Sequence, residues 1–526
     1  MRKRTFLFNA LCLTASAFVM RLINIGYRIY LTDKIGAEGM GLYQLIYAVF
    51  VFAITVSTSG ISLSVTRIVT AVLSGGQRKT LRSCVRKCVL FSLSLSLLAA
   101  AALICCAGWI GNVIVGDDRV VRSLQVLALG LPFMAACSCL KGYFLAVRGV
   151  LKSAMGELLE QFVTISVTVA LFVVLSPADV ERCCCAIMIG STVGEMASCL
   201  FTYGLYRAHL RKLIGKSHAK STGVLRQICH IVIPITISST LRSGLSVIEN
   251  LLIPIGFRKN GASAASALAE YGIIDGMVMP VLLFPFTFVQ SFASLLVPEM
   301  TEALTLRHKN HIRYVSGRAI GATLLFSIFT AVFCICFSRE IGLLLYDSAE
   351  SARLMQILAP LIPLLYLDNV VDYLLKGLDQ QLPSLRYNFI DTAIRVVLVY
   401  FLLPIAGTKG YLCILFFSTI FNAALSLHRL LKTADLQIAV FRRVVLPSFC
   451  ALLAVILPTL LLRSVPTLGS SLWAMPLCVL LLSVPCYILL LRCVGSVRQE
   501  DVLWLRSLFS TTKKTAPQSC PIQKGS

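Results

Sequence analysis

The sequence predicts an all-α polytopic membrane protein with about fourteen transmembrane helices. Of its 526 residues, 57% are hydrophobic and only 14% are charged, whereas soluble chains carry about 25% charged residues. Apolar runs of about 20 residues, the length that crosses a bilayer as a helix, recur from end to end. Helices satisfy their own backbone hydrogen bonds in lipid, so runs of this length are typical of membrane-spanning helices.

The distribution of Lys and Arg supports this count. The net charge is +24, which in a soluble protein would indicate a nucleic-acid partner. With the N-terminus inside, the inner segments carry 32 of the 48 Lys and Arg residues, the outer segments 10 and the spans six. Cytoplasmic loops of membrane proteins are enriched in Lys and Arg. We therefore expect an even number of spans, both termini in the cytoplasm and no nucleic-acid partner.

The first six spans lie on apolar runs that are separated by charged segments. Basic inner segments at 72–87 and 148–156 end the second and fourth spans, and 207–226 ends the sixth. The outer breaks are marked by fewer cations, among them Lys34 and Arg182. The predicted limits are 6–30, 42–70, 88–110, 123–147, 157–176 and 184–206.

The remaining eight spans follow the same rule. Inner segments at 299–318, 376–386 and 429–443 alternate with outer breaks such as Lys409 and Arg463. The predicted limits are 228–256, 272–297, 319–338, 354–375, 387–405, 410–428, 444–462 and 471–491. Gly and Pro residues within 272–286 predict a bend in the eighth span, which suits a gate or a static kink.

Two short matches indicate an internal repeat. The sequence Ala-Glu that starts at Ala37 returns at Ala269, 232 residues later, and Leu-Lys-Gly ends at Gly142 and again at Gly377, 235 residues later. This offset covers an even number of spans, so the repeat is parallel and encloses a site between its halves. We expect an N-lobe (1–206), a cytoplasmic basic linker (207–227), a C-lobe (228–430), two extra spans (431–492) and a cytoplasmic tail (493–526).

Four arginines within the spans are the candidate substrate-binding residues. Arg21 and Arg28 are seven residues apart, so they share one helix face. Each costs at least about 2.5–3.5 kcal/mol near the bilayer centre, so such residues face a wet cavity or a bundle interior. Arg67 and Arg242 are the other two. A guanidinium binds phosphate oxygens in a bidentate way, which suits a pyrophosphate. The alternatives are interfacial anchoring for Arg28 and Arg67, and structural pairing for Arg21.

Acids within the spans are candidates for coupling or gating. We single out Glu157, Glu160, Asp275 and Asp391, with Na⁺ or H⁺ as the coupling ion and no other cofactor. In the register of the repeat, Glu157 falls within one residue of Asp391. Structural pairing is the alternative, as for Asp391 with Arg395 four residues on. The other acids in spans, expected to neutralise cations or to couple, are Glu195, Glu249, Asp368 and Asp372.

Catalytic and metal-binding patterns are absent from the sequence. It contains no nucleophile elbow, no P-loop and no Cys or His spacing typical of a metal site. The 20 cysteines lie mostly in or beside apolar runs, where small apolar residues are expected. We therefore expect neither an enzyme nor a metal protein.

Several motifs resemble the stage V sporulation protein B family. They are the stretch from Arg21 to Arg28 followed by IGAEGMGLYQ (35–44), then YGIIDGMVMP (271–280) with LVPE (296–299), LKGLDQQ (375–381) and FLLPIAG (401–407). That family belongs to the exporter superfamily of multidrug extruders, polysaccharide flippases and lipid II flippases. The resemblance implies two six-helix lobes that alternate between inward and outward openings. In lipid II flippases, which also have fourteen spans and cations in spans one and two, the last two spans lie beside a groove for the lipid tail.

The residues and the resemblance together predict a flippase of the bacterial plasma membrane. Its expected cargo is an undecaprenyl-pyrophosphate-linked oligosaccharide or a peptidoglycan precursor, for spore cortex by resemblance. Membrane lipids and cell-wall synthesis enzymes are the expected partners. One alternative is a multidrug or metabolite cation antiporter of the same fold, which an arginine-lined cavity disfavours. Another is a cell-wall assembly protein that transports nothing, in which the cavity arginines would be replaceable.

Overall fold

The computed structural model describes residues 2–74, 80–147, 149–175, 179–214, 224–436, 441–464 and 472–495. Every regular element in these ranges is a helix, in agreement with the predicted fold class. Most of the predicted tail (493–526) and the middle of the predicted linker (207–227) lie outside the described residues.

The helices follow the predicted spans closely. Their bounds are α1 (Arg2–Thr58), α2 (Ile61–Ser74), α3 (Leu81–Trp109), η2 (Ile110–Val115), α4 (Arg119–Ala146), α5 (Val150–Leu175), α6 (Val180–Ile214), α7 (Val224–Lys259), α8 (Ala264–Tyr271), η3 (Gly272–Val278), α9 (Met279–Leu283), α10 (Phe286–Thr305), α11 (Lys309–Cys336), α12 (Ser338–Tyr346), α13 (Ala349–Leu358), η4 (Ala359–Leu361), α14 (Ile362–Gly377), α15 (Gln381–Ala434), η5 (Phe441–Val445), α16 (Leu446–Arg463) and α18 (Ala474–Cys493).

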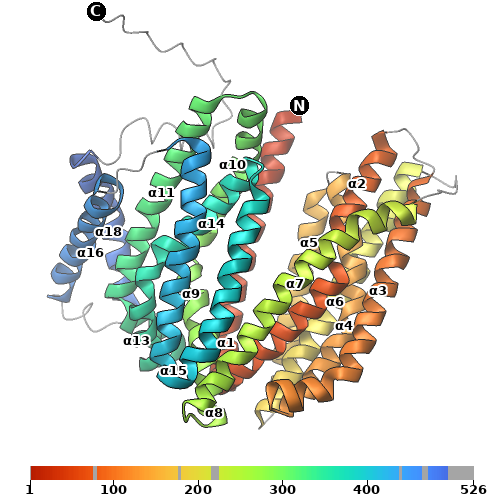
Figure 1. Cartoon of the computed structure of the whole chain (residues 1–526), viewed down its shortest axis with the longest axis horizontal. Coiled ribbons are helices and arrows are strands. Elements are labelled where there is room, and N and C mark those ends of the chain that lie inside the picture. Colours follow the sequence, from red (N-terminus) through yellow and green to blue (C-terminus); the bar gives the residue numbers. More distant parts are fainter. Residues whose placement is uncertain are drawn as a thin grey trace, which may run out of the picture.

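Twelve described helical segments are long and apolar enough to cross a membrane. Two of them, of 56 and 54 residues, are more than twice the length that one crossing needs. Each is a pair of spans joined at a glycine with positive φ: Gly36 (φ 67°, ψ −175°) and Gly407 (φ 53°, ψ −136°). The chain reverses its direction at both positions (Figure 1). Glycine populates this conformation without a side-chain clash. Counting each pair as two gives fourteen spans.

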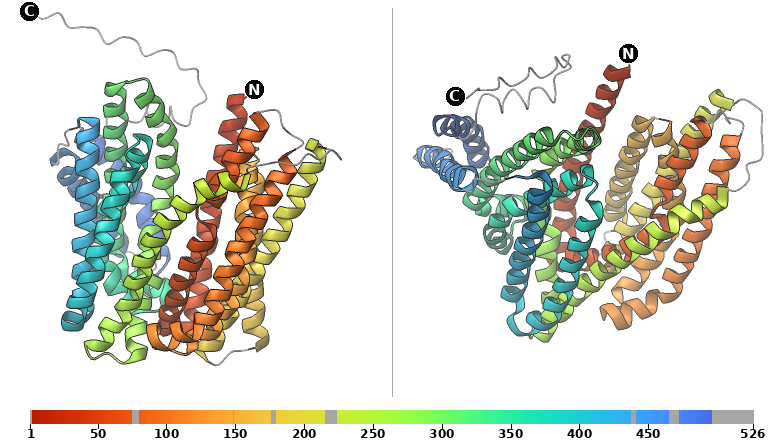
Figure 2. Two further views of the ribbon diagram at one scale, coloured as in Figure 1. Left: turned by 45° about the vertical axis from the view of Figure 1, so that its right-hand side comes forward. Right: turned by 45° about the horizontal axis from the view of Figure 1, so that its top comes forward.

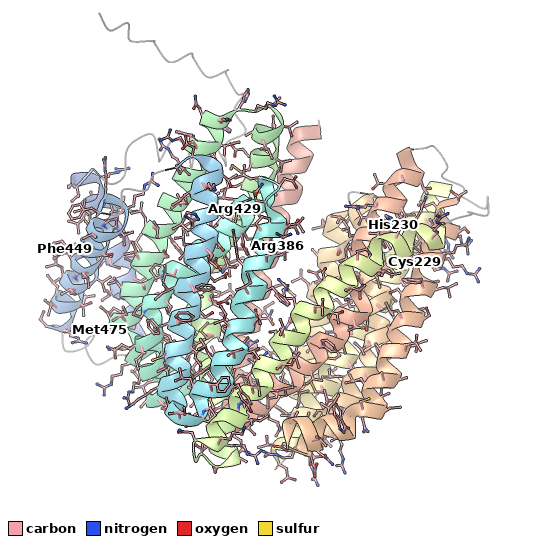
Figure 3. All side chains as sticks on the ribbon, in the orientation of Figure 1. Cys229, His230, Arg386, Arg429, Phe449 and Met475 are labelled. Carbon is pink, nitrogen blue, oxygen red and sulfur yellow. The ribbon has the colours of Figure 1, made fainter. Side chains whose placement is uncertain are left out.

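The helices form two bundles with a smaller pair at one side (Figure 1). We call α2–α6, with the second half of α1, the N bundle, and α8–α15 the C bundle. The last two spans, α16 and α18, pack on the C bundle through α11, where Tyr487 donates to the carbonyl oxygen of Leu325 at 3.1 Å. Phe449 of α16 and Met475 of α18 mark this outlying pair (Figure 3).

Two long helices connect the bundles. The first half of α1 contacts the N bundle through Tyr27, which donates to Thr168 at 3.1 Å, and the C bundle through Phe18, whose ring lies 4.9 Å from that of Phe288. Helix α7 starts beside the N bundle, where Cys229 and His230 lie, and crosses to α15 (Figure 3). The bundles diverge at the end of the molecule where α1 begins, which we call the N-terminal end, and approach each other at the far end (Figure 2).

One packing contact occurs twice, at the offset of the repeat. Thr66 donates to the carbonyl oxygen of Gly142 at 2.9 Å, and Thr301 donates to that of Gly377 at 3.1 Å. Both pairs join the second and fourth spans of their halves, and the equivalent residues are 235 positions apart, as the sequence match at Gly142 and Gly377 predicts. At both glycines a Cβ atom would meet a backbone oxygen within 3 Å, so the helices touch closely.

The bundles meet at the far end through a second pair of glycines. A Cβ atom on Gly41 would overlap the carbonyl oxygen of Leu268, and one on Gly272 would overlap that of Ala37. We call the contact of residues 37–41 with residues 268–272 the far-end crossing. Residues 37–41 lie at the start of the second span, and residues 268–272 lie at the start of the eighth. The eighth span then bends as predicted, through the π-helical turn η3 and again at Pro285.

Candidate functional site

A polar cavity of about 610 Å³ lies between the bundles. Four helices line it: the end of α1, and α7, α14 and α15. We call it the central cavity. Its lining residues are Val51, Thr55, Ser59, Ser239, Arg242, Ser243, Ser246, Leu365, Asp368, Asn369, Asp372, Asn388, Asp391, Thr392, Arg395, Ser418, Thr419 and Asn422.

Helical spacing gathers these side chains on single faces. On α7 the residues Ser239, Arg242, Ser243 and Ser246 recur at three- and four-residue intervals, which places them on one stripe. On α14 the pair Asp368 and Asp372 is four residues apart. Charged groups within a membrane protein face the protein interior or water, and the cavity provides that surrounding.

Arg395 forms the most buried ion pairs of the cavity. Its Nη2 atom lies 3.2 Å from Oε2 of Glu249, and its Nε atom lies 3.5 Å from Oδ2 of Asp391. Both carboxylates are buried, with 7% and 8% of their side-chain surface exposed. Ser418 also donates to Asp391 at 2.7 Å. The single guanidinium is therefore balanced by two carboxylates. The structure also contains the pairing of Asp391 with Arg395 that the four-residue spacing suggests.

The two aspartates of α14 are held by neutral groups instead. Asn422 donates to Asp368 at 2.9 Å and to the amide oxygen of Asn388 at 3.0 Å. Ser384 donates to Asp372 at 2.6 Å. Among the described residues neither carboxylate has a Lys or Arg nitrogen within 4.0 Å. This wall of the cavity thus presents negative charge that the chain itself does not neutralise.

Arg21 and Arg28 lie on α1 and face the C bundle. Arg21 donates to the side-chain oxygen of Gln290 at 3.3 Å, and Arg28 donates to the carbonyl oxygen of Gly276 at 3.4 Å. Within the described part of the chain neither arginine has a carboxylate partner within 4.0 Å. Their shared helix face therefore keeps N–H donors free for an anion.

The structure does not gather all four predicted arginines in one place. Arg242 lines the central cavity, whereas Arg21 and Arg28 are not among its lining residues. Arg67 is exposed on α2, towards the N-terminal end. The four cations therefore lie on three helices, α1, α2 and α7, and only Arg242 shares the cavity with the aspartates.

The four predicted coupling acids have four different surroundings. Glu157 forms an ion pair with Lys141 at 3.2 Å, whereas the buried Oε2 atom of Glu160 has no hydrogen-bond partner among the described residues. Asp275 accepts a hydrogen bond from Tyr411 at 2.8 Å. Asp391 pairs with Arg395, as described above. Glu157 and Glu160 belong to the N bundle, and the two aspartates to the C bundle.

The site residues singled out from the sequence leave out most of the cavity wall. The sequence prediction does not include Asn388, Asn422 or Ser418, and it names Asp368 and Asp372 only among the other acids within spans. A polar stripe with four-residue spacing inside an apolar span, such as Asp368 with Asp372, is the signal that marks such a wall. In the described residues no group of three or more His, Cys, Asp or Glu side chains has the geometry of a metal site.

Comparison with known proteins places this arrangement in a family. The family described as "Polysaccharide biosynthesis protein" matches residues 6–304, and the MatE family matches residues 261–401. The chain is 24% identical over 416 residues to stage V sporulation protein B of Bacillus subtilis (strain 168), which covers 78% of this chain and 80% of the relative. It is also 23% identical over 161 residues to the lipid II flippase MurJ of the same organism, covering 29% of this chain and 30% of the relative.

Two groups of solved structures share the fold. The lipid II flippase MurJ in an inward closed conformation has a TM-score of 0.67 at 13% identity, covering 95% of this chain and all (100%) of that one. An inward-facing multidrug resistance transporter of the MATE family has a TM-score of 0.63 at 14% identity, covering 81% and 97%.

Proposed function

This chain belongs to the polysaccharide biosynthesis protein family, and on that premise we propose that it flips a lipid-linked oligosaccharide or a peptidoglycan precursor across the bacterial plasma membrane. At the coarser level it is a multi-pass membrane flippase or transporter of the same superfamily as its relatives. None of the relatives reported above is described as an enzyme. The likeness to stage V sporulation protein B favours a precursor for spore cortex as cargo.

One observation supports the anionic cargo: Arg21 and Arg28 lie on α1, face the C bundle and have only neutral hydrogen-bond partners. A guanidinium has five N–H donors, and one contact from each arginine is accounted for. A pyrophosphate supplies oxygens that accept bidentate, charge-assisted hydrogen bonds. We assign Arg21 and Arg28 to the pyrophosphate, and Arg67 and Arg242 to its path between the N-terminal end and the central cavity.

The excess of Lys and Arg at one side of the membrane sets the orientation that we propose. It places the N-terminal end, and both termini, in the cytoplasm. The bundles diverge at that end and are joined at the far-end crossing (Figure 2). In this orientation the conformation is inward-facing, ready to accept a precursor made in the cytoplasm. Opening the far-end crossing would release the cargo outside.

Coupling to an ion is the remaining part of the cycle. We propose that Glu160 holds the coupling ion, because its buried Oε2 atom has no hydrogen-bond partner among the described residues. Glu157, Asp275 and Asp391 are assigned to gating, through contacts that tie spans together. A net charge moved through 100 mV is worth about 2.3 kcal/mol, enough to bias such an equilibrium. Cell-wall synthesis enzymes are the proposed protein partners.

Native mass spectrometry of gently purified full-length protein tests the cargo. We expect a polyprenyl-pyrophosphate lipid to remain bound to the wild type and to be lost from the Arg21→Ala, Arg28→Ala double variant. Arg122→Ala is the matched control, since Arg122 is 75% exposed at the far end of the N bundle. Wild-type protein free of such lipid, in cells that contain it, would contradict the proposal.

Export of lipophilic cations is the second candidate function. The match of residues 261–401 to the MatE family and the unneutralised Asp368 and Asp372 favour it. The unpaired arginines of α1 oppose it, since they repel a cation. Cells that express the chain and lack their own exporters would accumulate less of a cationic dye if this candidate were correct.

A further inference from the structure

The two sides of the central cavity carry opposite charge. Arg242 projects from α7 without a carboxylate partner within 4.0 Å in the described residues, and Asp368 and Asp372 project from α14. Arg395 adds nothing to the positive side, because Glu249 and Asp391 already balance it. A purely anionic ligand would meet repulsion at α14, and a purely cationic one would meet repulsion at α7.

We propose that the wall formed by Asp368, Asp372 and Asn422 binds a primary ammonium group on the head group of the cargo. This inference rests on the proposed function, since it places the ammonium on the same molecule as the pyrophosphate. The cargo is then dipolar: its phosphates face the arginines of α1 and α7, and its amine faces α14.

Hydrogen-bonding capacity supports an ammonium at this wall. An ammonium has three N–H donors and no acceptor. The wall offers two carboxylates, and the amide oxygen of Asn422 has no hydrogen-bond partner among the described residues. Both donors of the Asn422 amide are engaged, by Asp368 and by Asn388, which fixes its oxygen as the free acceptor. The wall therefore offers hydrogen-bond acceptors that match the three N–H donors of an ammonium group.

The neighbouring polar groups keep this wall in place without supplying a cation. Ser384 and Asn388 both donate to Asp372, at 2.6 and 3.4 Å. These contacts orient the carboxylate but add no positive charge. A carboxylate without a charged partner attracts a cation, and this attraction is stronger in a protein cavity than in bulk water. The ligand supplies that charge, so electrostatics favours its binding.

Binding of defined lipids to full-length protein in nanodiscs tests the proposal. The probes are short-chain polyprenyl pyrophosphates that carry a free hexosamine, the same sugar with its amine acetylated, or a lysine-like side chain on a peptide. The two amine probes distinguish a sugar amine from a peptide amine. We expect at least one of them to bind about tenfold more tightly than the acetylated probe, a difference of about 1.4 kcal/mol.

The Asp368→Asn, Asp372→Asn double variant should abolish that preference without weakening binding of the acetylated probe, whose affinity stays equal or rises because the repulsion at α14 is removed. Asp379→Asn is the matched control, because Asp379 is an exposed aspartate outside the cavity whose positive φ of 58° an asparagine also adopts. Equal binding of amine and acetylated probes by the wild type would overturn the proposal. Two other results would also overturn it: a double variant that binds neither the amine probe nor the acetylated probe, or displacement of the amine probe by Na⁺ at the same concentration as the probe.

A fourth probe separates this inference from the function on which it rests. Soluble hexosamine carries the amine without lipid or phosphate. If no polyprenyl probe binds but the soluble amine binds in a manner that requires Asp368 and Asp372, the flippase proposal fails and the amine site stands. If the acetylated lipid binds and the amine gives no advantage, the flippase proposal stands and the amine site fails.

Discussion

Replacing Gly272 by alanine tests the far-end crossing as a gate. In the structure a Cβ atom at this position would overlap the carbonyl oxygen of Ala37 and would lie 2.5 Å from the amide nitrogen of Gly41. Both neighbours are backbone atoms, so no side chain can turn aside. The two helices must separate, and they are separate in a state that is open at the far end. Gly272→Ala should therefore shift the equilibrium towards that state.

The size of the shift follows from packing energetics. Forcing one extra methyl group into a tight contact costs about 1–3 kcal/mol. A change of that size alters an equilibrium constant by about 5- to 160-fold. Helix propensity is a separate effect that acts on both states alike, since alanine favours a helix over glycine by about 1 kcal/mol. Gly321→Ala measures that second effect alone, because nothing lies within 4 Å of a Cβ atom on Gly321.

Hydrogen–deuterium exchange with mass spectrometry measures this opening through the exchange rates of backbone amides. Peptides covering 37–44 and 268–278 should exchange faster in Gly272→Ala than in the wild type, because local opening exposes their amides. Peptides from α11 should be unchanged, which shows that the fold is intact. If the crossing exchanges equally in Gly272→Ala, Gly321→Ala and wild type, the crossing is not a gate.

Three further predictions concern cargo, orientation and packing. Arg28→Lys should keep part of the flipping rate and Arg28→Ala should lose most of it, since lysine attracts phosphate without the bidentate fork; accessibility of precursor on the outer leaflet measures this, and normal rates in Arg28→Ala would make the arginine structural. Reporter fusions at Ser263 and His308 should report opposite sides of the membrane, and a shared side would refute the span count between them. Thr66→Val and Thr301→Val should each lower stability by about 0.5–1.5 kcal/mol through a lost hydrogen bond; thermal unfolding in detergent measures both, and a neutral effect at one site alone would show that the halves are not equivalent there.

Local sequence patterns were enough for the topology but not for the cavity. Apolar length and the positions of Lys and Arg predict fourteen spans because each span must cross the same thickness of lipid. The break of one continuous helix at Gly60, with φ of 74°, escaped prediction because the apolar run passes through it unchanged. The two partners of Arg395 show the difference between local and distant contacts. Asp391 is four residues away and can be predicted from the sequence. Glu249 is 146 residues away and is brought near only by the packing of α7 on α15.

The duplicated Thr–Gly contact also has a bearing on how the chain can be divided. Each half holds its own second and fourth spans together by that contact, and each begins and ends at the same end of the molecule. A cut between Ile214, where α6 ends, and Val224, where α7 begins, would separate the halves. Two co-expressed fragments would each insert in the orientation that their own Lys and Arg dictate. We therefore expect the two halves, when produced as separate chains, to assemble with each other in the membrane as the two parts of a pseudo-dimer.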